Sequence, residues 1–186
     1  MSVRPEWPIT FFDEDYLKIY RPQLTEERNR LETEFIAGAL DLPHGATVLD
    51  LACGVGRHAI GMAKLDYQVT GVDFNPRYLE IAAEEAEKAG VTVRWMVGDM
   101  RALQFEEAFD GAYSFFTSFG YFPDGENEQV NANLSRALRH SAAASVFASA
   151  TRKSSGTSAR VASSTRISCR SCASPAATSA SPTVAS

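Results

Sequence analysis

Three aspartates each follow a short apolar run, and a glycine-rich turn follows the first of them. Asp50 leads into Gly54-Val-Gly56, while Asp73 and Asp99 end two later runs. Glycines let a backbone approach a ligand closely, and a helix that begins directly after them offers unpaired N–H groups to an anion. A carboxylate such as that of Asp73 can accept hydrogen bonds from both hydroxyls of a sugar. The pattern therefore favours a ligand that carries an anionic end and a ribose-like diol.

Alternating strand and helix patterns bring these residues to one edge of one sheet. The expected strands are 47–51, 68–72, 91–97 and 109–115, and the expected helices are 57–65, 76–89 and 126–138. Repeated strand–helix units imply a mostly parallel sheet with right-handed crossovers and helices on both faces. Ligands of such sheets bind beyond the carboxyl ends of the strands. We therefore predict an α/β fold of the Rossmann-like, doubly wound type over residues 47–139.

Residues 1–46 are expected to form an N-terminal cap that contains one amphipathic helix, 25–40. Thr25 favours the start of this helix, and Pro43 and Gly45 stop it. Four apolar residues at helical spacing predict its buried face: Leu31, Phe35, Ala39 and Leu42.

Four motifs in order, each at a predicted strand end, resemble the class I S-adenosylmethionine-dependent methyltransferases. They are Val48 to Gly56, Gly71-Val-Asp73, Gly98-Asp99-Met100, and Phe109 to Phe116 with the following Thr117 to Phe122. The resemblance implies S-adenosylmethionine as the cofactor and methyl transfer to a small molecule as the activity. It runs to Leu138, whereas family members continue through three more strands. A truncated, non-catalytic cofactor-binding fragment is therefore the alternative to an active enzyme.

The resemblance assigns cofactor-binding roles to residues at the strand ends and in the N-terminal segment. The carboxylate end of the cofactor falls to the first motif, the ribose to Asp73, the adenine to Phe74, Asp99 and Met100, and the sulfonium to an aromatic wall. The full predicted set is Asp50, Ala52, Gly54, Gly56, Asp73, Phe74, Asp99, Met100, Phe115, Tyr16 and Tyr20. No catalytic base is identified, because His58 and His44 lie at a helix start and in a turn.

Two of these interpretations have a competing explanation. Gly54-x-Gly56-x-x-Ala59 with a following Asp73 also satisfies the relaxed dinucleotide-binding pattern, so a nicotinamide-dependent oxidoreductase is the rival assignment. Asp50 before the loop and the Gly98-Asp99-Met100 motif count against it. The aromatic residues after the fourth strand, Phe115 to Phe122, are explained equally well by core packing.

Composition limits the partners. The net charge of −5 provides no broad basic surface for nucleic acid. No apolar run is long enough to cross a bilayer, and the N-terminus lacks the apolar core of a signal peptide, so we expect a cytoplasmic protein with a small-molecule substrate.

Cys169 and Cys172 form one C-x-x-C pair, too few ligands for zinc, and no metal site is expected. The oligomeric state is left open.

The segment 140–186 departs from the rest of the chain, because most of its residues are Ser, Ala or Thr and its charges are all positive. Such a composition buries too little apolar surface to offset the entropy of ordering. We expect either a disordered tail or a shifted reading frame after Arg139. Read in the other frame, the codons of residues 140–147 permit a Gly-Gly-Arg turn and an apolar strand. Without that strand, the fourth strand is expected to lie exposed at the edge of the sheet.

Overall fold

The computed structural model describes residues 14–20, 22, 24–115, 122–139, 144–150 and 161–162. Six strands form one sheet, in the order β3-β2-β1-β4-β5-β6. The strands are β1 (Thr47–Leu51), β2 (Gln68–Asp73), β3 (Arg94–Val97), β4 (Gly111–Phe115), β5 (Ala144–Ala150) and β6 (Val161–Ala162). The helices are α2 (Glu14–Tyr20), α3 (Glu26–Leu40), α4 (Arg57–Lys64), α5 (Pro76–Lys88), the 3-10 turn η2 (Met100–Ala102) and α6 (Asp124–Ala137). The predicted α/β fold is confirmed, with β3 starting three residues later than expected.

Parallel pairing brings the predicted residues to one edge. β1 pairs with β2 on one side and with β4 on the other, both in parallel. The chain runs outward from β1 to β3 and then returns to β4, so the strand order reverses beside β1. At this reversal Asp50 is aligned with Gly71 on β2 and with Tyr113 on β4. A crevice at such a point is where open α/β sheets bind ligands.

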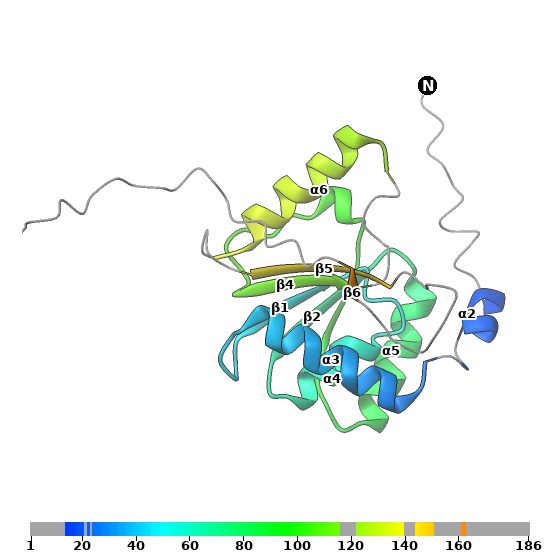
Figure 1. Ribbon diagram of the computed structural model, residues 1–186. Coiled ribbons are helices and arrows are strands. Elements are labelled where there is room, and N and C mark those ends of the chain that lie inside the picture. The colour runs from blue at the N-terminus through cyan, green and yellow to red at the C-terminus, as the bar shows by residue number, and fades with distance from the viewer. Residues whose placement is uncertain are drawn as a thin grey trace, which may run out of the picture.

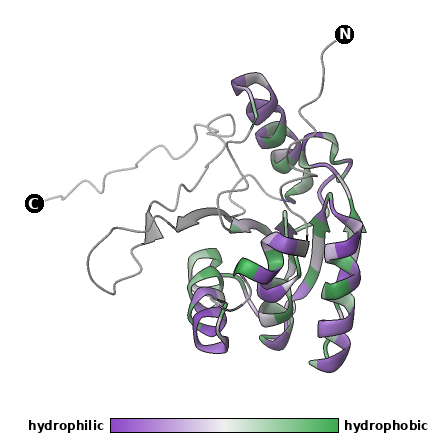
Figure 2. Cartoon of the chain, turned by 90° about the vertical axis from the view of Figure 1, so that its right-hand side faces the viewer, coloured by the Kyte–Doolittle hydropathy of each residue, from purple (hydrophilic) through white to green (hydrophobic). Residues whose placement is uncertain are grey.

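Helices cover both faces of the sheet. Figure 1 shows α3, α4 and α5 on one face and α6 on the other. Two apolar clusters fill the layers between, one around Ile36, Met62 and Tyr113 and one around Leu49, Val130 and Leu134. In Figure 2 the helices carry both hydrophilic and apolar segments, as expected of amphipathic helices packed on a sheet. Among the residues that the structure describes, no helix is long and apolar enough to cross a membrane.

The buried face of α3 differs from the predicted one. Thr25 caps the helix, since its hydroxyl accepts a hydrogen bond from the Arg28 N–H at 3.2 Å. The buried residues are Thr33, Ile36 and Leu40, whereas Leu31 is 52% exposed, and its prediction as a core residue was wrong. The pattern missed Thr33 because it is polar. Its burial follows from close packing on α4, where a Cβ at Gly61 would lie 2.4 Å from the Thr33 hydroxyl oxygen.

The edge of the sheet beyond β4 also differs from the prediction. β5 (Ala144–Ala150) pairs in parallel with β4 over five residue pairs, so β4 is not exposed along its outer side. Strand pairing uses backbone N–H and C=O groups, which every residue except proline supplies, and 144–150 contains no proline. The Ser- and Ala-rich composition therefore failed to predict that this segment pairs with β4 as a strand. Residues 140–143, 151–160 and 163–186, with the predicted disorder and the Cys169–Cys172 pair, lie outside the described residues.

Candidate cofactor-binding site

The turn between β1 and α4 is a left-handed backbone path. Ala52, Gly54 and Gly56 have φ values of 59°, 56° and 75°, a region that favours glycine. The two glycines have different surroundings. A Cβ at Gly54 would meet no atom within 4 Å, whereas a Cβ at Gly56 would lie 2.5 Å from the Trp95 ring and 2.8 Å from Ala82. Gly54 thus borders open space, and Gly56 makes room for the packing of Trp95 beneath the turn.

Asp73, at the carboxyl end of β2, joins this turn to the next one. Its Oδ2 accepts a hydrogen bond from the Gly54 N–H at 2.8 Å, and its Oδ1 accepts one from the Asn75 N–H at 2.9 Å. The residue is only 5% exposed, and this burial raises the pKa of the carboxyl above its ordinary value. Backbone donors on both oxygens fix the orientation of the side chain, which is what recognition of a diol requires.

Asp50 lies beneath the turn rather than on its surface. The side chain is buried, the Tyr113 hydroxyl donates to its Oδ2 at 3.0 Å, and the Ala59 N–H in the first turn of α4 donates to the carboxyl as well. Burial raises the pKa of Asp50 to about 7, although the Tyr113 hydrogen bond opposes the shift. Asp50 therefore satisfies a donor of the α4 N-terminus and supports the turn from below.

A buried polar cluster ties the first turn of α4 to α3. The Glu32 carboxylate contacts the Arg57 guanidinium and, at 3.0 Å, His58 Nε2, while Arg57 also donates to Asn29 Oδ1 at 2.8 Å. Burial opposes ionisation of Glu32, but hydrogen bonds from His58, Arg28 and Arg57 prevail and lower its pKa to about 2. Burial lowers the pKa of His58 to about 4, so this ring is neutral at physiological pH. The cluster anchors the helix that carries the glycine turn.

Asp99, after β3, is held by a side chain rather than by a neighbouring turn. Arg101 donates to both of its carboxylate oxygens through Nε at 3.0 Å and to Oδ2 through Nη2 at 2.6 Å. The Arg101 backbone N–H donates to Oδ1 at 2.8 Å, which makes Asp99 the N-cap of η2. Asp99 thus lies at the edge of the sheet, as predicted, and its carboxylate is paired with the Arg101 guanidinium.

The other predicted residues lie in different environments. Phe74 is half-buried next to Asp73, and Met100 packs against the α6-side core. Phe115 is 7% exposed in the other core cluster, edge-on to His58 with ring centroids 4.6 Å apart, which favours core packing over an aromatic wall. Tyr16 and Tyr20 stack on each other at 4.3 Å in α2, which lies outside the two layers in Figure 1. Residues 116–121 lie outside the described part of the chain.

Sequence reasoning missed the residues that support the site from behind. Trp95, Glu32 and Arg101 help to hold the turns in place but lie outside the four motifs, and Tyr113 lies in the fourth motif without a predicted role. Tyr113 lies in a short strand that is buried throughout, where it resembles a core residue. Glu32 lies among the charged residues of α3, where it resembles a solvent-exposed side chain. Only Arg101 had a local signal, since it lies two residues after Asp99, which was predicted to bind the adenine.

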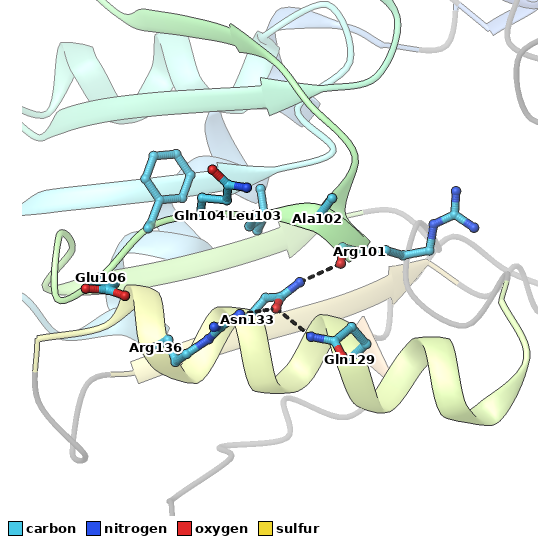
Figure 3. Close-up of a pocket in the computed structure, with 9 residues that line it drawn as sticks. Arg101, Ala102, Leu103, Gln104, Glu106, Gln129, Asn133 and Arg136 are labelled. Atoms are coloured by element: carbon cyan, nitrogen blue, oxygen red, sulfur yellow. Dashed lines mark hydrogen bonds between the residues drawn. The ribbon is translucent and has the colours of Figure 1, made fainter.

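A cavity of about 550 Å³ lies between η2 and α6, on the face opposite α4. Figure 3 shows its polar lining, in which Asn133 extends from α6 toward the Arg101 carbonyl. None of the predicted cofactor residues lines this cavity. Among the described residues, no group of three or more His, Cys, Asp or Glu side chains is arranged to hold a metal ion.

The reversal of strand order beside β1, with a glycine turn and two acidic turns at the same edge, defines a nucleoside-binding α/β domain. Comparison with known proteins makes the class specific. The family model described as a methyltransferase domain matches residues 48–141, just over half of the chain. The chain belongs to this methyltransferase family.

Individual relatives agree with the family. The chain is 35% identical over 80 residues to a ubiquinone biosynthesis O-methyltransferase of Xanthomonas axonopodis pv. citri, a match over 43% of this chain and 33% of the relative. It is 40% identical over 97 residues to an S-adenosyl-L-methionine-dependent Diels-Alderase of a Neonectria species, over 48% of this chain and 38% of the relative. The chain spans well under half the length of the curated relatives it matches.

A solved structure supports the same fold. The TehB-like S-adenosylmethionine-dependent methyltransferase of Corynebacterium glutamicum matches with a TM-score of 0.59 and 25% identity, over 73% of this chain and 71% of that one. The family match decides against the nicotinamide-dependent assignment of the glycine turn. S-adenosylmethionine is accordingly the cofactor that goes with this family.

Proposed function

We propose that this chain binds S-adenosylmethionine at the carboxyl ends of β1, β2 and β3, and that the protein transfers its methyl group to a small molecule. The observation that carries the proposal is the junction of the glycine turn with the Asp73 carboxyl, oriented by the N–H groups of Gly54 and Asn75. The residues fit the cofactor, because Gly54 borders open space and a fixed carboxylate suits a vicinal diol.

Each predicted residue has a proposed task. Gly54 and the first turn of α4 receive the carboxylate end of the cofactor, with Ala52 and Gly56 shaping the backbone and Asp50 supporting it. Asp73 binds the ribose, while Phe74, Met100 and Asp99 bind the adenine. Tyr16 and Tyr20 stay proposed contacts of the N-terminal segment, and Phe115 acts by packing behind the site.

Bound S-adenosylmethionine supplies a methyl group on a sulfonium, whose leaving group is a neutral thioether. The chain's residues have to align the acceptor with that methyl group, and such alignment is a large source of rate acceleration. A proton acceptor is required only for a protonated nucleophile. His58 is not proposed for that task, because it is buried and hydrogen-bonded to Glu32, and because burial lowers its pKa to about 4, which makes it a weak base.

The relatives favour a small-molecule acceptor, since one is named for ubiquinone biosynthesis. We further propose a cytoplasmic location and no nucleic-acid partner, which agrees with the net charge of −5. The proposed organisation is an N-terminal cap over 1–46, a cofactor-binding domain over 47–139 and a separate C-terminal segment over 140–186.

A second function on the same cofactor site follows from the Diels-Alderase relative. In that case the bound cofactor would assist a cyclisation and would not be consumed. The two functions differ in one product: methyl transfer releases one S-adenosylhomocysteine per turnover, and cyclisation releases none.

The location of the site is tested by titrating the ¹⁵N-labelled full chain with S-adenosylhomocysteine and following amide chemical shifts. We expect the largest changes at Gly54, Gly56, Phe74 and Asp99, and little change along the exposed side of α5. Saturable changes confined to the cavity-lining residues Gln104, Gln129 and Arg136 would contradict the proposed site.

A further inference from the structure

Arg101 encloses the carboxylate of Asp99 from one side. Its backbone N–H, Nε and Nη2 all donate to the two carboxylate oxygens, at distances from 2.6 to 3.0 Å. The Nε–H is shared between the two oxygens, so these three N–H groups together fix the plane of the carboxylate. A planar guanidinium fixes the plane of a carboxylate in a way that a point charge cannot.

Arg101 is itself held from α6, on the opposite face of the sheet from α4. Its Nη1 donates to Glu126 Oε2 at 2.6 Å, and its guanidinium carbon lies 4.5 Å from the centroid of the Phe122 ring. The buried Asn133 donates to the Arg101 carbonyl oxygen at 2.8 Å. Figure 3 shows Asn133 pointing to that carbonyl while the Arg101 side chain extends away from it. Both the backbone and the side chain of Arg101 are therefore anchored on one helix.

A capping role alone does not account for these contacts. The N-cap of η2 is complete with the hydrogen bond from the Arg101 N–H to Asp99 Oδ1. The guanidinium adds a second, charge-assisted contact to the same carboxylate and links it to the first turn of α6. This extra contact lies at the sheet edge where the adenine is proposed to bind.

We propose that Arg101 is the positioning residue for adenine recognition: held by Glu126 of α6 and by Phe122, which precedes that helix, it orients the Asp99 carboxylate to accept a hydrogen bond from the exocyclic amine of the adenosyl group. The inference rests on the proposed function, since it assumes that the adenine lies beside Asp99. It makes α6 part of the cofactor site, although no α6 residue was predicted to contact the cofactor.

The test uses two ligands that differ at that amine and at the adjacent ring nitrogen N1, which carries a proton only in the inosyl ligand. S-adenosylhomocysteine and S-inosylhomocysteine, in which a carbonyl oxygen replaces the amine, are titrated calorimetrically into the full-length wild type, Arg101→Lys and Glu126→Gln. We expect the wild type to prefer the adenosyl ligand about tenfold, the loss of one hydrogen bond. Arg101→Lys should lower the affinity for the adenosyl ligand about fivefold, because lysine cannot donate to both carboxylate oxygens in one plane. The affinity for the inosyl ligand should stay within about twofold of the wild-type value.

Glu126→Gln keeps the experiment decisive if Arg101→Lys folds poorly, because Glu126 is half exposed and lies outside the core. It should reduce the preference in the same direction by a smaller factor. Arg77→Lys, in an exposed pair with Glu80 on α5, is the matched control and should preserve the preference. Equal losses for both ligands, or an unchanged preference in both variants, would overturn the role of Arg101. A wild type that binds neither ligand would instead refute the proposed function.

Discussion

The two acidic turns of the proposed site are held in opposite ways. At the end of β2, Asp73 is 5% exposed and oriented by backbone N–H groups of two different turns. At the end of β3, Asp99 retains 36% of its side-chain exposure and is oriented by the side chain of Arg101. The first turn belongs to the packed interior, while the second depends on a surface ion pair between η2 and α6.

This difference predicts where the site is rigid. Backbone donors move only when the fold moves, so the ribose end is expected to be preformed. A partly exposed ion pair is weak, because solvent screens it and because ordering its side chains costs entropy. Substitutions in the β2 turn should therefore affect folding and binding together, whereas those in the β3 turn should affect mainly the recognition of adenine.

The largest effect is expected when a methyl group is added to the glycine turn between β1 and α4, to which Asp73 is hydrogen-bonded from the end of β2. Gly56→Ala places a Cβ 2.5 Å from the Trp95 ring at a φ of 75°, which combines overpacking with left-handed strain and should remove roughly 2–4 kcal/mol of unfolding free energy. Gly98→Ala in the second turn meets only Val72 Cγ1, at 3.1 Å, and should remove about 1 kcal/mol or less. Urea denaturation measures both, and equal losses would remove the contrast between the turns.

The next effect is the pH dependence that Asp50 gives to stability. Its pKa is about 7 in the folded protein, against 3.8 as the ordinary value. Between these values the folded chain keeps a proton that the unfolded chain releases, so stability falls as the pH rises from about 4 to 7. Asp50→Asn should reduce the loss of unfolding free energy between about pH 4 and pH 7 by roughly 2–4 kcal/mol.

Urea denaturation at pH 4.5 and pH 7.5 measures this effect. Asp73, whose pKa is also raised by burial, adds to the same trend and interacts electrostatically with Asp50, so the difference between wild type and variant reports Asp50 together with this interaction. Glu84→Gln, on the exposed side of α5, is the matched control. Parallel pH profiles for wild type and Asp50→Asn would show that the buried carboxyl is not the source.

At the ribose end, Asp73→Asn should weaken the binding of S-adenosylhomocysteine by about 1.5–3 kcal/mol, the range for hydrogen bonds to a charged group. The amide keeps one acceptor oxygen for the backbone donors but loses the charge. Fluorescence or calorimetric titration gives the affinity, and the denaturation midpoint should fall as well. Unchanged affinity in a folded variant would mean that the ribose is held elsewhere.

The same substitution at the adenine end is expected to have the smallest effect. Asp99→Asn removes one exposed, charge-assisted acceptor and should weaken the same ligand by about 1–1.5 kcal/mol, with little change in stability. Titration under identical conditions allows the two aspartates to be ranked directly. A larger loss of affinity for Asp99→Asn than for Asp73→Asn would reverse the proposed division between a rigid and an adjustable end.

The sequence predicted the first of these turns far better than the contacts of the second. Strand and helix periods, with glycines at positions that require positive φ, located β1, β2, α4 and Asp73 nearly to the residue. The clamp of Arg101 depends on α6, which lies far along the chain, and no local pattern predicts such a pairing. Trp95 was missed for the same reason, since its neighbours Gly56 and Gly71 come from other elements.

Two predictions failed because they used the segment's own pattern without its neighbours: the spacing of apolar residues for Leu31, and the composition for 144–150. Leu31 is apolar but exposed, because a polar Thr33 occupies the closest contact between α3 and α4. The segment 144–150 is rich in Ser and Ala but forms β5, because β4 provides a row of backbone partners. In both places a neighbouring element decided the outcome.

Parallel calorimetric titrations with S-adenosylhomocysteine and NAD⁺ test whether the edge formed by β1, β2 and β3 binds an adenosyl sulfur cofactor. We expect a single-site isotherm for S-adenosylhomocysteine and an affinity at least about tenfold lower for NAD⁺, equivalent to about 1.4 kcal/mol. Asp73→Asn should weaken the binding of S-adenosylhomocysteine, because the proposed contact with the ribose is lost. Tighter binding of NAD⁺ than of S-adenosylhomocysteine by the wild type would contradict the proposed cofactor.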